Sequence, residues 1–150
     1  MEILIVRHGE SVANAEGRMQ GQSDYPLSGA GEQQAALLGR FLNNAGLRFD
    51  AAYTSPLTRA RSTALALTTA LGLPDAELAP ELSELNAGSL QGLTRPEIIE
   101  AFPGFLQRGL TELGDFSEYG GESYDDVQRR IRSLLARWHE RHLADAHRIL

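Results

Sequence analysis

The chain has 150 residues, of which 42% are hydrophobic, with a formal net charge of −6 and no cysteine. This length and composition fit one domain with a packed core. The negative charge argues against nucleic acid or an anionic membrane as a partner, and the lack of cysteine excludes disulfides and thiolate catalysis. No apolar run is long enough to span a membrane and none resembles a signal peptide, so a cytoplasmic location is the default expectation.

The first predicted element is a strand over residues 3–6, whose four consecutive apolar residues indicate burial on both faces. The sequence Arg7-His8-Gly9-Glu10 follows, so a cation and an imidazole stand at the carboxyl end of this strand. In open α/β sheets that end is where ligands bind. Residues 9–30 are rich in Gly, Ser, Asn and Gln, which predicts a long functional loop with at most one helical turn.

The next segments predict a helix over residues 30–45, ended by Gly46, and a short strand over residues 50–54. Another helix then starts with Ser55 as its N-cap and Pro56 at its first position, and ends at Gly72. This alternation predicts a parallel sheet with right-handed crossovers. Both strands then point the same way, so Ser55 and Arg59 are expected at the same end of the sheet as His8.

The second half of the chain predicts a weak third strand over residues 76–80 and a short helix to about residue 102, with Thr94 and Glu97 as a capping box. Residues 104–121 are interpreted as an irregular covering segment. Ser123 and Asp126 form a second capping pair before a long helix over residues 123–143. Residues 147–150 look like the opening of another strand. One face of the long helix is apolar, and most of its arginines are expected on a solvated face: Arg129, Arg130, Arg132 and Arg137.

In this order, the motifs of the chain resemble those of the histidine phosphatase superfamily, also called phosphoglycerate mutase-like. The match extends over essentially all 150 residues. It rests on Arg7-His8-Gly9-Glu10 with Asn14, Arg18-Met19-Gln20-Gly21, Leu27-Ser28 with Gly31, Gln34 and Ala35, Ser55-Pro56-Leu57 with Arg59, Ala60, Thr63 and Ala64, Leu82 with Glu84, and Gly121-Glu122-Ser123. The resemblance implies one α/β domain over residues 1–150, a three-layer sandwich with a mostly parallel sheet flanked by helices.

The resemblance also implies a metal-independent phosphohistidine mechanism without a cofactor. His8 would be the nucleophile and Glu84 the proton donor to the leaving group. The phosphate and the rest of a small phosphorylated substrate would be held by Arg7, Asn14, Gln20, Gly21 and Arg59. Physical chemistry supports these roles, because flanking guanidinium groups favour the neutral, nucleophilic imidazole and can neutralise a transferring phosphoryl group.

The sequence disfavours two alternatives, a metal site built from histidines and the mutase branch of the family. His139 and His142 lie three residues apart on a predicted helix and could be metal ligands, but the sequence offers no evident third ligand. The loop with Gln20-Gly21 and the short segment between Glu84 and Gly121 favour the phosphatase branch. A phosphoglycerate mutase remains the alternative enzyme, and the substrate stays open among sugar phosphates, phosphoglycerate, nucleotide or cofactor-precursor phosphates and phosphoproteins.

The chain departs from the family pattern at its end. The family carries a second histidine after a later strand, in a Ser/Thr-His-Gly context, whereas this sequence ends at Arg148-Ile149-Leu150. We therefore expect the C-terminal part of the fold to be absent and the pocket to lack one donor, which would lower activity and favour a homo-oligomer. An impaired phosphate-binding module is the alternative outside the enzyme class.

Overall fold

The computed structural model describes residues 1–105, 115–142 and 147–150. Its strands are short: β1 (Glu2–Ile3), β2 (Tyr53–Thr54), β3 (Glu77–Leu78) and β4 (Arg148–Ile149). Its α-helices are α1 (Val12–Ala15), α2 (Gly29–Asn44), α3 (Thr58–Leu71), α4 (Arg95–Ala101) and α5 (Tyr124–His142). Three single turns of 3₁₀-helix lie at Pro80–Leu82, Gly88–Leu90 and Ser117–Tyr119. None of the described helices is long and apolar enough to cross a membrane.

The strands form two parallel pairs that are joined edge to edge. β1 pairs with β4, and β2 pairs with β3. A parallel bridge between Ala51 and Ile149, together with the Tyr53 N–H that donates to the Leu150 carbonyl over 2.8 Å, connects the pairs. The spatial order is therefore β1-β4-β2-β3, and β4 lies inside the arrangement although it comes last in the chain.

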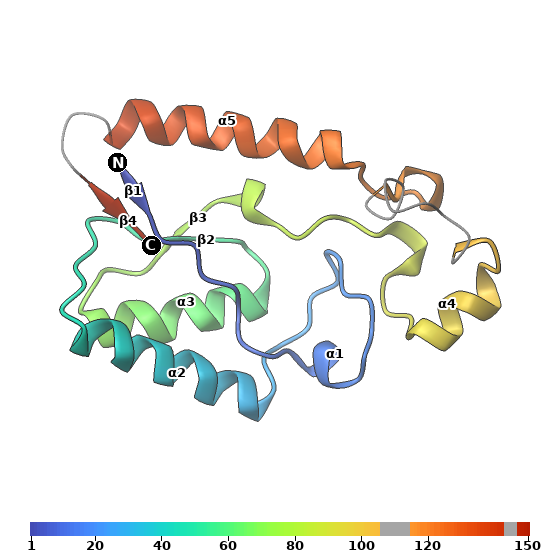
Figure 1. Ribbon diagram of the computed structural model, residues 1–150, viewed down its shortest axis with the longest axis horizontal. Coiled ribbons are helices and arrows are strands. Elements are labelled where there is room, and N and C mark those ends of the chain that lie inside the picture. Colours follow the sequence, from blue (N-terminus) through green and yellow to red (C-terminus); the bar gives the residue numbers. More distant parts are fainter. Residues whose placement is uncertain (106–114, 143–146) are drawn as a thin grey trace.

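Helices cover both faces of these strands (Figure 1). α2 and α3 pack side by side on one face, and α5 runs along the opposite face. This is the predicted α/β architecture, with helices flanking a mostly parallel sheet. All strand pairings are parallel, so β1 and β2 run in the same direction. The loops that follow β1 and β2 therefore lie at the same end of the sheet, as predicted.

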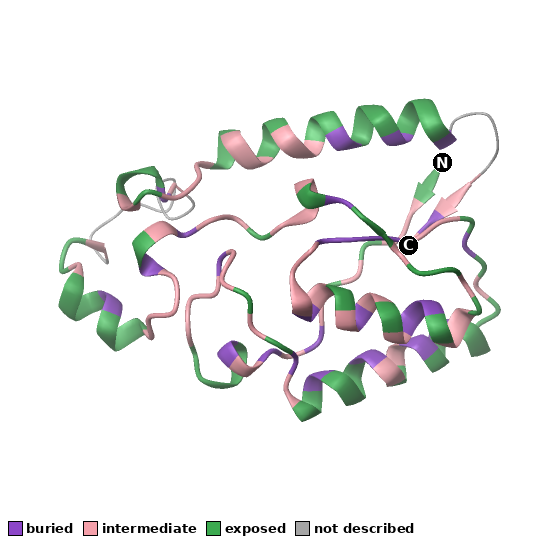
Figure 2. Ribbon diagram, turned by 180° about the vertical axis from the view of Figure 1, so that it is seen from behind, coloured by how far each residue is buried: buried purple, intermediate pink, exposed green. Residues whose placement is uncertain are grey.

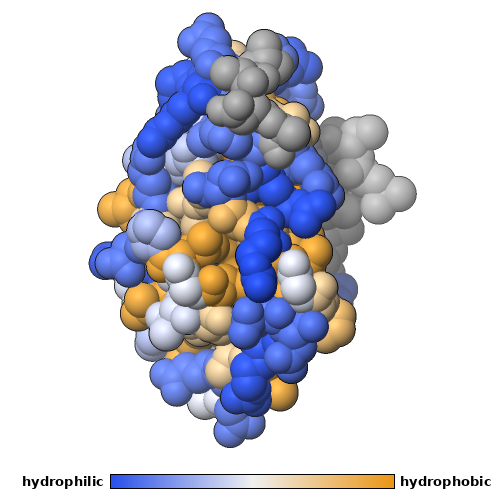
Figure 3. Space-filling view, turned by 90° about the vertical axis from the view of Figure 1, so that its left-hand side faces the viewer, coloured by the Kyte–Doolittle hydropathy of each residue, from blue (hydrophilic) through white to orange (hydrophobic). Residues whose placement is uncertain are grey.

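The core lies between the strands and α5. In Figure 2 the buried residues of α5 lie on the side of the helix that faces the strands, and its outer side is mostly exposed. The Trp138 ring lies with its centroid 4.6 Å from that of Tyr53, and Leu134 lies one helical turn before Trp138. The cluster consists of Tyr53, Ala79, Leu134, Trp138 and Ile149. At the end of the molecule where the strands begin, apolar side chains gather in the middle and hydrophilic ones surround them (Figure 3).

The helix boundaries agree well with the local signals in the sequence. Thr94 and Glu97 form the predicted capping box of α4. The Ser123 backbone N–H and hydroxyl both donate to the Asp126 carboxylate, which caps α5. These hydrogen bonds, the Ser123 hydroxyl first, lower the pKa of Asp126 to about 2. Of the predicted covering segment, residues 106–114 lie outside the described residues, and residues 117–119 form a 3₁₀ turn.

The prediction of a fully buried strand over residues 3–6 is wrong. β1 ends at Ile3, and the Ile5 side chain is 87% exposed. Leu4 still donates its N–H to the Ile149 carbonyl, over 2.8 Å. Among the described residues, no backbone hydrogen bond joins Val6 to a strand, so the chain leaves the sheet after Leu4. An apolar run has the propensity for a strand, but a ladder also needs a neighbouring strand of equal length.

The predicted start of α3 is also wrong. Leu57 is the N-cap and gives no side-chain hydrogen bond, while the Ser55 hydroxyl accepts only from the Leu57 N–H, over 3.3 Å. The carboxylate of Asp24 takes over the capping role, because it accepts from the Thr58 N–H at 2.7 Å and the Thr58 hydroxyl at 2.6 Å. A residue 34 positions earlier in the chain thus caps the helix, which no local pattern predicts.

Candidate active site

The backbone of the loop after β1 packs closely against the start of α2 next to His8. The Gly9 N–H donates to the Thr63 hydroxyl on α3, over 3.1 Å. A Cβ on Gly9 would collide with the Gly31 carbonyl at the start of α2, and one on Gly31 would collide with the carbonyl of Glu10. Both glycines are therefore required for this approach. The result is that His8 is presented from a rigid turn between the two helices.

The His8 ring is held in one tautomer. Its Nδ1 lies 2.6 Å from the Gly9 carbonyl, an acceptor, so Nδ1 carries the proton. Its Nε2 accepts from the Nε–H of Arg59 over 3.3 Å and is therefore the ring nitrogen that carries the lone pair. Burial lowers the pKa of His8 below 6.5; the Gly9 carbonyl raises it, and the guanidinium groups of Arg59 and Arg7 lower it. His8 is thus a neutral imidazole at neutral pH, with Nε2 facing a cation.

Arg59 is the most deeply placed charge of the site, with only 1% of its surface exposed. It comes from the first turn of α3, and its guanidinium donates to the carbonyls of Gly21 (2.7 Å) and Ser23 (2.9 Å) besides His8. Burial lowers the pKa of Arg59, whereas the nearby carboxylates of Glu84 and Asp24 raise it. Within the described residues these contacts use three of its five N–H donors, which leaves two for an anion.

Glu84 and Arg7 complete the group of charges around His8. Both side chains are exposed. The Glu84 carboxylate raises the pKa of His8 and the Arg7 guanidinium lowers it, so both lie near enough to act on the imidazole. One oxygen of Glu84 accepts from the Leu85 N–H over 3.0 Å, which leaves the other oxygen to the solvent side.

The predicted substrate loop is organised by a buried serine that the sequence did not single out. The Ser11 hydroxyl donates to Gln20 Oε1 (2.6 Å) and contacts Asn14 Oδ1 (3.0 Å), so both amide side chains are turned toward Ser11. Gly21 has a φ of 51° and its carbonyl binds Arg59. The structure therefore brings Arg59 into direct contact with both His8 and Gly21, whereas the side chains of Asn14 and Gln20 contact Ser11.

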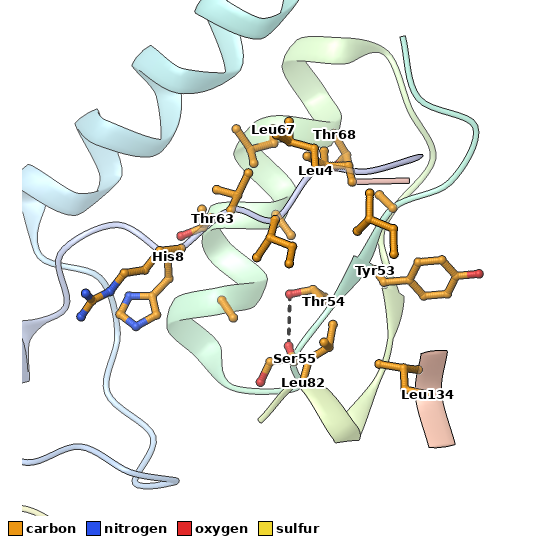
Figure 4. Close-up of a pocket in the computed structure, with 18 of the residues that line it drawn as sticks. Leu4, His8, Tyr53, Thr54, Ser55, Thr63, Leu67, Thr68, Leu82 and Leu134 are labelled. Carbon is orange, nitrogen blue, oxygen red and sulfur yellow. Dashed lines mark hydrogen bonds between the residues drawn. The ribbon is translucent and has the colours of Figure 1, made fainter. Parts of the chain in front are cut away.

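A cavity of about 530 Å³ extends from His8 and Glu84 into the sheet. Figure 4 shows His8 at one end of this cavity, and Tyr53 and Leu134 at the other. Its walls come from the chain around β1 and β2, from α3 and α5, and from Leu150. Most of this lining is apolar, and its charged or titratable side chains at one end are Arg7, His8 and Glu84.

The other histidines do not join this site. His139 is exposed on α5, while the buried His142 binds the Tyr53 hydroxyl through Nε2 over 2.8 Å and His147 through Nδ1 over 3.0 Å. In the part of the chain that the structure describes, no group of three or more His, Cys, Asp or Glu side chains could hold a metal ion.

Comparison with known proteins gives the same family by sequence and by structure. The sequence model of the histidine phosphatase superfamily (branch 1) matches residues 3–150. The metal-independent phosphoserine phosphatase of Arabidopsis thaliana is 36% identical over 142 residues, which cover 94% of this chain. A probable phosphoglycerate mutase of Yersinia enterocolitica is 37% identical and covers 90% of it. The crystal structure of a putative α-ribazole-5′-P phosphatase from Escherichia coli superposes with a TM-score of 0.84 and 27% identity over the whole chain.

The chain is shorter than these proteins. It spans 59% of the length of the Arabidopsis phosphatase and 61% of that of the Yersinia mutase. It covers 72% of the Escherichia coli structure. The similarity therefore concerns the whole of this chain but only part of each relative.

Proposed function

Because this chain belongs to the histidine phosphatase superfamily (branch 1), we propose that it hydrolyses a small phosphomonoester through a phosphohistidine formed on His8. The observation that supports this best is the contact between the Arg59 Nε–H and His8 Nε2. This contact shows that the lone pair of Nε2 faces a buried cation. A phosphoryl group bound beside Nε2 would therefore meet a nucleophile and a charge that stabilises its oxygens.

In the first step His8 Nε2 attacks phosphorus, and the bond from phosphorus to the ester oxygen breaks. The carboxyl of Glu84 gives its proton to the departing oxygen, so the product is an alcohol and not an alkoxide. In the second step the Glu84 carboxylate takes a proton from a water molecule, which attacks the phosphohistidine. Inorganic phosphate leaves and His8 returns to the neutral form.

The remaining residues bind the substrate in this proposal. Arg7 and the two free N–H groups of Arg59 hold the phosphoryl oxygens, and the charge on these oxygens needs several cations. Asn14, Gln20 and Gly21 line the approach to the phosphate. No metal ion is required, since guanidinium groups supply the positive charge.

The central test is the replacement His8→Ala. We expect it to abolish both turnover and the acid-labile phosphoenzyme that forms with labelled substrate, because none of the other three histidines lines the cavity. His139→Ala is the matched control, since it removes an exposed histidine of α5 and should leave both unchanged. Labelled phosphate that still forms an acid-labile adduct on the His8→Ala protein would contradict the proposal.

The similarity to the probable phosphoglycerate mutase of Yersinia enterocolitica supports phosphoglycerate mutase activity as a second candidate. Incubation with a phosphoglycerate separates the two, because a mutase interconverts the isomers while a phosphatase releases inorganic phosphate. A third result, binding of phosphate without turnover of any phosphomonoester, would favour the binding module.

A further inference from the structure

Arg130 departs from the other arginines of α5. Arg129, Arg132 and Arg137 lie on the exposed face, as the sequence predicts, whereas only 17% of the Arg130 side chain is exposed. Its guanidinium pairs with the Glu122 carboxylate, which is 23% exposed, through its Nε at 3.1 Å and one Nη at 3.3 Å. This two-point pair has a fixed geometry, unlike a single contact between flexible side chains.

The Glu122–Arg130 pair holds both flanks of the segment that carries Glu84. Arg130 donates to the backbone carbonyls of Glu81 and Glu84, the second over 3.4 Å. Glu122 accepts from the Asn86 N–H over 2.8 Å. The Asn86 carbonyl in turn accepts from the Glu122 N–H, again over 2.8 Å. Residues 81–86 are therefore held at both ends by the two members of one ion pair.

The same pair also reaches the loop that binds Arg59. The side-chain amide of Gln22 donates to the Glu84 carbonyl (3.0 Å) and to the Glu122 carboxylate (3.2 Å). Gln22 stands between Gly21 and Ser23, whose carbonyls accept from Arg59. The pair thus connects the segment of the proposed acid to the loop around the phosphate-binding arginine.

We propose that the Glu122–Arg130 pair is a positioning device that holds the Glu84 carboxyl at the leaving-group side of His8. This inference rests on the proposed function, because it concerns the step in which Glu84 gives up its proton. Glu84 itself is exposed, and the hydrogen bond that its carboxylate accepts comes from the neighbouring Leu85 N–H of the same segment. Its place is therefore set by its backbone, which Arg130 and Gln22 hold from opposite elements.

The replacement Arg130→Lys tests the proposal. Lysine keeps the charge but has no planar fork, so it cannot bind Glu122 at two points and both carbonyls at once. A misplacement of about 1 Å can cost ~10²-fold in rate. We expect kcat for an alkyl phosphate to fall by about 10- to 100-fold, with KM nearly unchanged. For nitrophenyl phosphate, whose leaving group barely needs a proton, the loss should stay below about threefold.

The matched control is Arg129→Lys, one residue away on α5, where the arginine is exposed and pairs with Asp126. It should change neither rate. Glu122→Gln serves as a second variant that removes the charge from the other side of the pair, and it should reproduce the leaving-group dependence.

Combination with Glu84→Gln makes the test decisive. If the pair acts through Glu84, Arg130→Lys should cost little more on the alkyl ester once Glu84 is neutralised. An equal loss on both esters, or a full additional loss in the Glu84→Gln background, would overturn the inference while leaving the phosphohistidine mechanism intact. A His8→Ala protein that still turns over would instead overturn the proposed function.

Discussion

Arg59 offers the sharpest test of the site, because its surroundings allow the effect to be estimated. The replacement Arg59→Met keeps the length of the side chain but leaves the carbonyls of Gly21 and Ser23 without their donors. A hydrogen bond from a charged group contributes about 1.5–3 kcal/mol. The two together amount to roughly 3–6 kcal/mol, against a total stability of about 5–15 kcal/mol for a typical domain. We expect a large fall in the free energy of unfolding.

The same replacement should weaken the binding of inorganic phosphate. The loss of one charge-assisted contact corresponds to at least a ~10-fold increase in Kd. It should also raise the pKa of His8, because one of the charges that lower this pKa is removed. Calorimetry gives the affinity, and an NMR titration of the His8 ring gives the pKa.

Two further variants make the outcome interpretable. Arg61→Met removes an exposed arginine two residues along α3 and should change neither affinity nor pKa. Arg59→Lys keeps the charge and should fold more stably than Arg59→Met, while losing part of the affinity. Phosphate that binds the folded Arg59→Met and Arg59→Lys proteins as tightly as the original chain would refute the assignment of Arg59 to the phosphate site.

The remaining predictions concern the acid, the pH dependence and the core. Glu84→Gln should slow hydrolysis of alkyl phosphates by ~10²–10⁴-fold and of nitrophenyl phosphate far less; equal losses would show that Glu84 is not the acid. Burial lowers the pKa of His8 and His142 below 6.5, so below that pH the unfolded chain binds more protons than the folded one. Urea titrations should therefore show stability falling as the pH drops from 7.5 through 6.5; a flat profile between pH 7.5 and 5 would contradict these shifts. Leu134→Ala should reduce the free energy of unfolding by about 2–5 kcal/mol, measured in the same way, and a change under about 1 kcal/mol would place Leu134 outside the core.

The sequence by itself determined the helices of the fold, apart from the start of α3, and the end of the sheet at which His8 and Arg59 lie. The helix caps at Thr94 and Ser123 and the spacing of apolar residues in α2 and α5 are local signals, complete within a few residues. The parallel topology that this alternation of elements predicts places His8 and Arg59 at one end of the sheet, because both follow strands that run in the same direction.

Only the tertiary structure decided which groups make contact. Asp24 caps α3, and the Gly9 carbonyl and Arg59 fix the tautomer of His8. Arg130 contacts Glu122 and the segment around Glu84. Strand β1 is shorter than the apolar run of residues 3–6 predicts, because the length of a strand depends on its partner strand. Such contacts join residues far apart in the chain, and their energies depend on burial and direction, which no pattern along one segment contains.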